Sequence, residues 1–183
     1  LLLFPLAIIL CNLSSRNILL ERALHNVRIA DFSRAHLAQG AHNSFEDIAA
    51  DAGWMAPELL AGEDYTESAD VYSFGIIAWE MTTNKVPFAG VPLHQIHQKV
   101  VLVVVLLLLH HVRDSMLMSK GVAITFSSQV IDGVRPEILK SCPTELRTLM
   151  EECWREPENR PSFRQLIRVL TDFGRSLRRA AVV

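Results

Sequence analysis

Residues 68–83, with the sequence SADVYSFGIIAWEMTT, constrain the fold more than any other part of this chain. Their apolar side chains lie around most of a helical wheel instead of along one stripe. These side chains are Val71, Phe74, Ile76, Ile77, Trp79 and Met81. A helix that is apolar on nearly all sides has to be buried, so other elements must surround it. With 183 residues, of which 50% are hydrophobic, the chain is long enough to build such a core in one domain.

Shorter segments with regular apolar spacing predict the elements around this helix. Residues 17–20 (NILL) and 27–30 (VRIA) are short apolar runs and predict two strands. Between residues 146 and 154 apolar side chains recur at helical spacing, which predicts an amphipathic helix. A last helix should open at Ser162, with Gln165 placed to complete a capping box. The side chains that we expect it to turn toward the core are Phe163, Leu166, Ile167, Leu170 and Phe173.

Charge and composition argue against several classes of partner. A formal net charge of -2 and a pI near 6.4 give no basic excess for nucleic acid or an anionic membrane. The apolar run 1–10 has no basic flank and is interrupted by Pro5, although a truncated signal core remains an alternative for it. The run 100–109 spans only about half of the ~20 residues that a membrane helix needs. The three cysteines are widely spaced and odd in number, which favours a reducing, cytoplasmic setting over a disulfide framework.

Five motifs follow one another between Asn12 and Phe173. They read NLSSRNILL, ADFS, WMAPELL, ADVYSFGIIAWEM and CWREPENRPSF. In order and spacing they resemble the C-terminal lobe of a protein kinase, and WMAPE, DVYSFGI and RPSF are most similar to the tyrosine-kinase-like group. The resemblance implies an α+β fold that is mostly α, with an incomplete or absent N-terminal lobe. It also implies ATP and Mg²⁺ as cofactors and a protein as substrate or partner.

The resemblance assigns the nucleotide and metal site to three residues. Asn17 matches the catalytic-loop asparagine and Asp31 the DFG aspartate, so the two are the expected Mg²⁺ ligands. Leu19 matches the apolar residue under the adenine. The alternative for Asn17 is an ordinary turn residue, and for Asp31 a cap at the end of a strand.

The catalytic position itself departs from the family pattern. Leu10, Cys11 and Asn12 align with the H-R-D motif, so Asn12 stands where the catalytic aspartate is expected. An amide can orient a hydroxyl group but cannot take its proton. Cys11 replaces the arginine that would bind an activation-loop phosphate. In that loop, residues 34–53 lack any period and predict a long exposed segment.

Five further residues match positions that shape the family's substrate groove and fold. Trp54 and Met55 match the floor of the peptide groove. Glu58 and Arg160 match a buried ion pair, and Asp70 matches the residue that holds the catalytic-loop backbone. A role in folding alone is the alternative for all five.

Two segments match nothing in the family and set the expected boundaries. Residues 1–11 form an apolar leader without the Gly-rich loop or lysine of an N-terminal lobe, and residues 100–129 interrupt two phrases that related lobes join directly. We expect kinase-like sequence at 12–99 and 130–175, followed by a tail at 176–183. The interruption begins with valine and ends with glutamine, whose codons can carry the two ends of an intron, so an unspliced intron is one origin and a genuine insertion the other.

Three functional interpretations follow. The first is a kinase-like C-lobe fragment from an enzyme that phosphorylates protein Ser or Thr, with Tyr as a further acceptor, and with little or no activity as written. The second is a pseudokinase module that binds protein partners near Trp54 and the segment after Pro92. The third is the non-functional product of a mis-spliced gene. Retention of both metal ligands favours a misread junction at residues 10–12 over drift after loss of catalysis.

Overall fold

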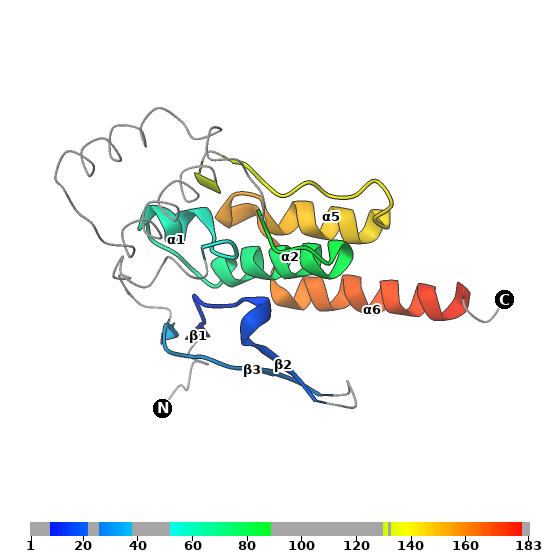
Figure 1. Ribbon diagram of the computed structural model, residues 1–183, viewed down its shortest axis with the longest axis horizontal. Coiled ribbons are helices and arrows are strands. Elements are labelled where there is room, and N and C mark those ends of the chain that lie inside the picture. Colours follow the sequence, from blue (N-terminus) through cyan, green and yellow to red (C-terminus); the bar gives the residue numbers. More distant parts are fainter. Residues whose placement is uncertain (1–7, 22–25, 38–51, 89–129, 132, 181–183) are drawn as a thin grey trace, which may run out of the picture.

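The computed structural model describes residues 8–21, 26–37, 52–88, 130–131 and 133–180. The expectations for the start of the leader, the middle of residues 34–53, the segment after Pro92 and the interruption 100–129 lie outside these residues. Within them the fold combines helices with two small antiparallel sheets (Figure 1). The strands are β1 (Ile8–Ile9), β2 (Ile18–Leu20), β3 (Val27–Ile29) and β4 (His36–Leu37). The helices are η1 (Ser15–Asn17), α1 (Pro57–Ala61), α2 (Ser68–Thr83), α5 (Thr144–Cys153), η4 (Pro157–Asn159) and α6 (Phe163–Ala180).

Helix α2 is the centre of the core, and the prediction of a buried helix over residues 68–83 is confirmed. It packs against α5, which in turn packs against α6, so that the three helices lie side by side (Figure 1). Tyr72 and Ile76 of α2 are fully buried, as are Met150 and Cys153 of α5. Met81, however, is 73% exposed, so the expectation that it belongs to the core is wrong. It lies in the last turn of α2, after the buried residues of the helix, which end at Trp79.

Helices α5 and α6 occur where the apolar spacing predicts them. At the start of α6, the Ser162 backbone N–H donates to Gln165 Oε1 at 2.7 Å, which is one half of the expected capping box. The other half is absent, because the Ser162 hydroxyl also donates to Gln165 Oε1 and the Gln165 N–H donates to the Ser162 carbonyl.

Of the apolar side chains expected to face the core from α6, Leu166 is buried and Leu170 and Phe173 are half-buried. Ile167 is 61% exposed, so the expectation is wrong for this residue. Ile167 directly follows the buried Leu166, so it lies on another face of the same turn of α6. Phe163 is 37% exposed and meets the expectation only in part, through a ring contact with Phe74. The C-terminal part of α6 projects beyond α5 (Figure 1).

The predicted strands pair as a hairpin in which Ile18 lies opposite Ile29 and Leu20 opposite Val27. A second pairing, of β1 with β4, joins Ile8 to Leu37 and was not predicted. It involves residues at the end of the expected leader and within the expected exposed loop. The last residues of that loop also differ from the expectation, because Ala52 is buried in the core.

None of the helices in the described ranges is long and apolar enough to cross a membrane.

Candidate active site

The loop between β1 and β2 brings three of the predicted site residues together. Asn12 donates its Nδ2 hydrogen to Asp31 Oδ2 at 2.8 Å. Asn17, in η1, donates from Nδ2 to the backbone carbonyl of Asn12 at 2.9 Å. The backbone carbonyl of Asn17 accepts from the N–H of Ala30 at 2.8 Å, which ties the loop to the end of β3. Side chains that are up to 19 residues apart in sequence therefore form one connected group.

Asp31 ends this group in an exposed and strained position. Its backbone has φ of 57°, a left-handed conformation that aspartate tolerates better than most residues. Hydrogen bonds from the Ser33 side chain and backbone, with a further one from Asn12, lower the pKa of Asp31 below its usual value. The carboxylate is therefore ionised at neutral pH and open to solvent.

These residues have the chemistry that Mg²⁺ requires. Mg²⁺ prefers oxygen ligands and is commonly held by one or two protein groups, with water and substrate phosphates completing its shell. Asp31 offers an ionised carboxylate, and Asn17 offers an amide oxygen because its nitrogen is already engaged with Asn12. Asn12 and Asp31 are in direct contact, so one hydrogen bond joins the expected catalytic position to an expected metal ligand.

Asp70 fixes the backbone at the start of the same loop. Its Oδ2 accepts from the Leu10 N–H at 2.7 Å and its Oδ1 from the Cys11 N–H at 3.0 Å. Cys11 itself has φ of 54°, so these bonds hold a residue that would not adopt this conformation readily. Burial raises the pKa of Asp70, and the two backbone N–H donors oppose that shift.

Trp54 and Met55, the residues predicted to form the groove floor, directly follow the long loop of residues 34–53. Both side chains are buried. The Trp54 indole N–H donates to Glu80 Oε2 at 2.6 Å. The other oxygen of Glu80 accepts from the Ser15 hydroxyl at 3.1 Å. The guanidinium of Arg16 lies 5.0 Å from the centre of a Trp54 ring, within the range of a cation–π contact. Glu80 therefore joins the catalytic loop to the predicted groove floor.

Glu80, Ser15 and Arg16 are candidate site residues that sequence reasoning missed. Ser15 and Arg16 lie inside the NLSSRNILL phrase, and Glu80 lies inside ADVYSFGIIAWEM, so the motifs contained them. Their mutual contact depends on how α2 and η1 pack, which no spacing along the chain reveals. Glu80 is, with Asp70, one of two carboxylates in the largely apolar helix α2, and this is the signal that could have singled it out.

Leu19 stands apart from the other predicted residues. It lies in the middle of β2, opposite Arg28 of β3, and is 54% exposed. No contact described in the structure joins it to Asn12 or Asp31. Its neighbours Leu20 and Val27 are exposed as well, so the hairpin presents an apolar surface.

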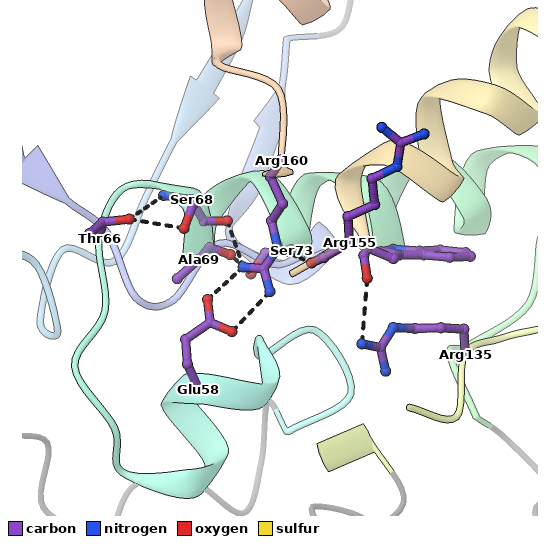
Figure 2. A network of polar contacts seen from close by, with 9 residues as sticks. Glu58, Thr66, Ser68, Ala69, Ser73, Arg135, Arg155 and Arg160 are labelled. Atoms are coloured by element: carbon purple, nitrogen blue, oxygen red, sulfur yellow. Dashed lines mark hydrogen bonds and ion pairs between the residues drawn. The ribbon is translucent and has the colours of Figure 1, made fainter. Parts of the chain in front are cut away.

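Glu58 and Arg160 meet beside the start of α2 in a buried network (Figure 2). The Arg160 guanidinium donates to both carboxylate oxygens of Glu58, at 2.5 and 2.9 Å. It also donates to the backbone carbonyls of Ser68, at 3.0 Å, and Arg155, at 2.7 Å. This network joins α1, the start of α2 and the segment before α6.

A family profile for protein tyrosine and serine/threonine kinases matches residues 7–170. The chain belongs to the protein kinase family. The match begins within the expected leader and extends across residues 100–129 to the middle of α6.

Individual protein kinases are similar to the chain at about 30% identity. A protein of Acanthamoeba polyphaga mimivirus, named as a serine/threonine-protein kinase/receptor, is 33% identical over 157 residues, which are 85% of this chain and 8% of that protein. Dual specificity protein kinase shkD of Dictyostelium discoideum is 33% identical over 85% of this chain and 17% of its own length. Human mitogen-activated protein kinase kinase kinase 7 is 29% identical over 93% and 23%. The chain thus spans less than a quarter of each of these kinases.

Proposed function

We propose that this chain carries the metal-binding and substrate-positioning lobe of a protein kinase domain of the tyrosine-kinase-like group, and that Asn12 has weakened or abolished its phosphoryl transfer. The observation that carries the proposal is the hydrogen-bonded group of Asn17, Asn12 and Asp31. It unites the catalytic position with two groups suited to Mg²⁺. In this proposal residues 12–99 and 130–175 make up the lobe.

Each residue of the group has a distinct part. Asp31 and Asn17 would hold the ions that neutralise the phosphates of ATP, and Leu19 would lie under the adenine. Bound Mg²⁺ supplies charge neutralisation during transfer of the phosphoryl group. Asn12 lies where the acceptor hydroxyl has to be oriented, but its amide nitrogen already faces Asp31 and carries no lone pair that can take a proton. The chain can therefore position an acceptor without deprotonating it.

The acceptor would be a Ser or Thr of a protein, with Tyr as a further acceptor. Trp54 and Met55 would form the floor of the groove for it, and Glu80 would hold that floor to the catalytic loop through Trp54 and Ser15. The relatives named as serine/threonine and dual specificity kinases support this substrate class. The three cysteines are unpaired, and we place the protein in the cytoplasm on that basis.

The deciding experiment compares the protein with its Asn12→Asp and Asp31→Asn variants. Each is incubated with Mg²⁺, radiolabelled ATP and a generic Ser/Thr substrate, in the longest chain that the transcript encodes. A positioned base contributes roughly 10² to 10⁴ in rate, so Asn12→Asp should exceed the parent by about that factor. Asp31→Asn should stay at background. Equal turnover by the parent and Asn12→Asp would overturn the proposed role of Asn12.

A pseudokinase that binds partners is the second candidate, and the engagement of Asn12 with Asp31 favours it. Nucleotide binding without phosphate transfer in the same assay would select this candidate. Transcript sequencing tests the third interpretation, the product of a mis-spliced gene. A transcript that encodes His, Arg and Asp in place of Leu10, Cys11 and Asn12, and that omits residues 100–129, would assign the changes to splicing.

A further inference from the structure

The side chain of Asn12 is oriented by Asp31. Asn12 is 6% exposed, and its Nδ2 donates to Asp31 Oδ2 at 2.8 Å. A carboxylate only accepts hydrogen bonds, so the amide nitrogen and not the amide oxygen must face it. The amide oxygen is left buried with no hydrogen-bond partner among the described residues. Asn12 thus donates a hydrogen bond to Asp31, while its own amide oxygen accepts none from the described residues.

The second oxygen of Asp31 is also engaged by the protein. Its Oδ1 accepts from the Ser33 backbone N–H at 3.2 Å. Both carboxylate oxygens therefore have an N–H donor from this chain, one from the catalytic loop and one from the DFS segment. Neutral donors stabilise an ionised carboxylate in the way a nearby cation does, although less strongly.

We propose that Asn12 takes the place of a counter-charge beside Asp31, so that the catalytic loop holds its conformation without a divalent cation. The inference rests on the proposed role of Asp31 as a Mg²⁺ ligand. An aspartate at position 12 would replace this neutral donor with a negative charge. It would set a second carboxylate at hydrogen-bond distance from the solvent-exposed Asp31. Position 12 is 6% exposed, so the new charge would be buried, and it would repel the ionised Asp31 unless a cation relieved the repulsion. The Asn12 amide makes the loop independent of Mg²⁺, and it competes with Mg²⁺ for Asp31 Oδ2.

Thermal unfolding of the 183-residue chain tests whether the loop holds its conformation without Mg²⁺. The protein, Asn12→Asp and Asn12→Asp with Asp31→Asn are compared at pH 7.5 in EDTA, in 10 mM MgCl₂ and in NaCl of matched ionic strength. We expect the parent to change its Tm by less than about 1 °C on adding Mg²⁺. Asn12→Asp should melt several degrees lower in EDTA and recover in Mg²⁺, since about 2 to 4 °C accompanies each kcal/mol in a chain of this size. The double variant should lose the response to Mg²⁺.

Two results would overturn the inference in this experiment. One is a Mg²⁺-induced rise in the Tm of the parent as large as that of Asn12→Asp. The other is an Asn12→Asp variant that melts with the parent in EDTA. Either result leaves the proposed kinase function standing if the parent binds nucleotide. Conversely, failure of nucleotide binding with the expected Tm pattern would remove that function and keep the inference about Asn12.

A second measurement covers the case in which Asn12→Asp does not fold. Mn²⁺ is titrated against the parent, Asn12→Ala and Asp31→Asn, and free Mn²⁺ is followed by electron paramagnetic resonance. Removal of the Asn12 donor leaves Asp31 Oδ2 without its bond to the amide, so Asn12→Ala should bind Mn²⁺ several-fold more tightly than the parent, and Asp31→Asn should bind most weakly. Equal or weaker binding by Asn12→Ala would show that the amide does not compete for Asp31.

Discussion

Arg160 lies 102 residues after Glu58 in the sequence, and its guanidinium donates to both oxygens of that carboxylate. Both side chains are almost fully buried. The Arg160 guanidinium also lies over the Tyr72 ring, 5.3 Å from the ring centre. A single arginine therefore links α1, α2 and the segment before α6.

Removal of one member of this pair should be costly. Arg160→Met leaves the Glu58 charge buried without a partner, and we expect a loss of about 3–5 kcal/mol in the free energy of unfolding. The double variant with Glu58→Leu should recover part of that loss, because no buried charge remains. Urea denaturation measures both. The exposed Arg28–Glu21 pair is the matched control, and Glu21→Gln should cost less than about 1 kcal/mol.

Gly75 should not tolerate a methyl group. A Cβ at this position would lie 2.6 Å from the Cβ of Cys153 and 2.7 Å from Nε1 of Trp154. Overpacking of this kind costs about 1–3 kcal/mol, which exceeds the gain of about 1 kcal/mol in helix propensity. Gly75→Ala should therefore lower the Tm. Gly174→Ala in α6, where an added Cβ meets nothing within 4 Å, should raise it, and a common effect of both changes would contradict the packing argument.

The link between the catalytic loop and Trp54 should depend on the carboxylate of Glu80. Each of its oxygens accepts from a different donor, Ser15 or Trp54, and a glutamine at this position would retain only one acceptor oxygen. We expect Glu80→Gln to cost about 1–3 kcal/mol and to speed hydrogen exchange in residues 13–17. Glu151→Gln, at an exposed position of α5, is the control. Unchanged exchange in residues 13–17 would show that Glu80 does not hold the loop.

The three cysteines should differ in reactivity. Burial raises the pKa of Cys11 to about 11 and that of Cys153 to about 12. These thiols stay protonated as the pH rises from 7 to 9, so no more than about 1% of either is thiolate. Cys142 is half-buried and should be labelled first by a disulfide reagent at pH 8. Mass spectrometry of the labelled chain checks this order, and early labelling of Cys153 would mean that α5 opens in the native protein.

Deletion of residues 100–129 should preserve or raise the Tm. It joins Lys99 to Val130, whose side chain is buried and whose carbonyl accepts from Arg135 at 2.8 Å. If Val130 still occupies the core, the deletion removes only an apolar block. Exposed apolar surface of this kind favours aggregation. Solubility and Tm of the two proteins are compared. A lower Tm after deletion would show that the block belongs to the folded domain.

Sequence reasoning succeeded where periodicity was long or a motif was dense. Helix α2 has the predicted bounds, because sixteen residues give a clear helical pattern. The β1–β4 pairing was missed because two-residue strands such as Ile8–Ile9 have no period to detect. Met81 and Ile167 were misplaced because hydropathy shows which residues can be buried, whereas the packing of the neighbouring elements decides which of them are.

The candidate site could likewise be predicted only in part. The motifs located Asn12, Asn17 and Asp31, and the three residues do form one hydrogen-bonded group, through the Asn12 side chain to Asp31 and the Asn12 backbone carbonyl to Asn17. The direction of the Asn12 amide could not be predicted, because it depends on a contact between two loops. The same holds for Glu80, whose partners lie 26 and 65 residues away in sequence.

The position of α2 in the sequence has a consequence for how the protein is made. Its helical partner α5 begins roughly 60 residues after α2 ends, and ribosomes add about 5–20 residues per second. For several seconds of each synthesis, a helix whose side chains are apolar on most sides lacks the surface that will cover it. The nascent chain is therefore a substrate for chaperones during that interval, and slower translation between residues 84 and 143 lengthens its exposure.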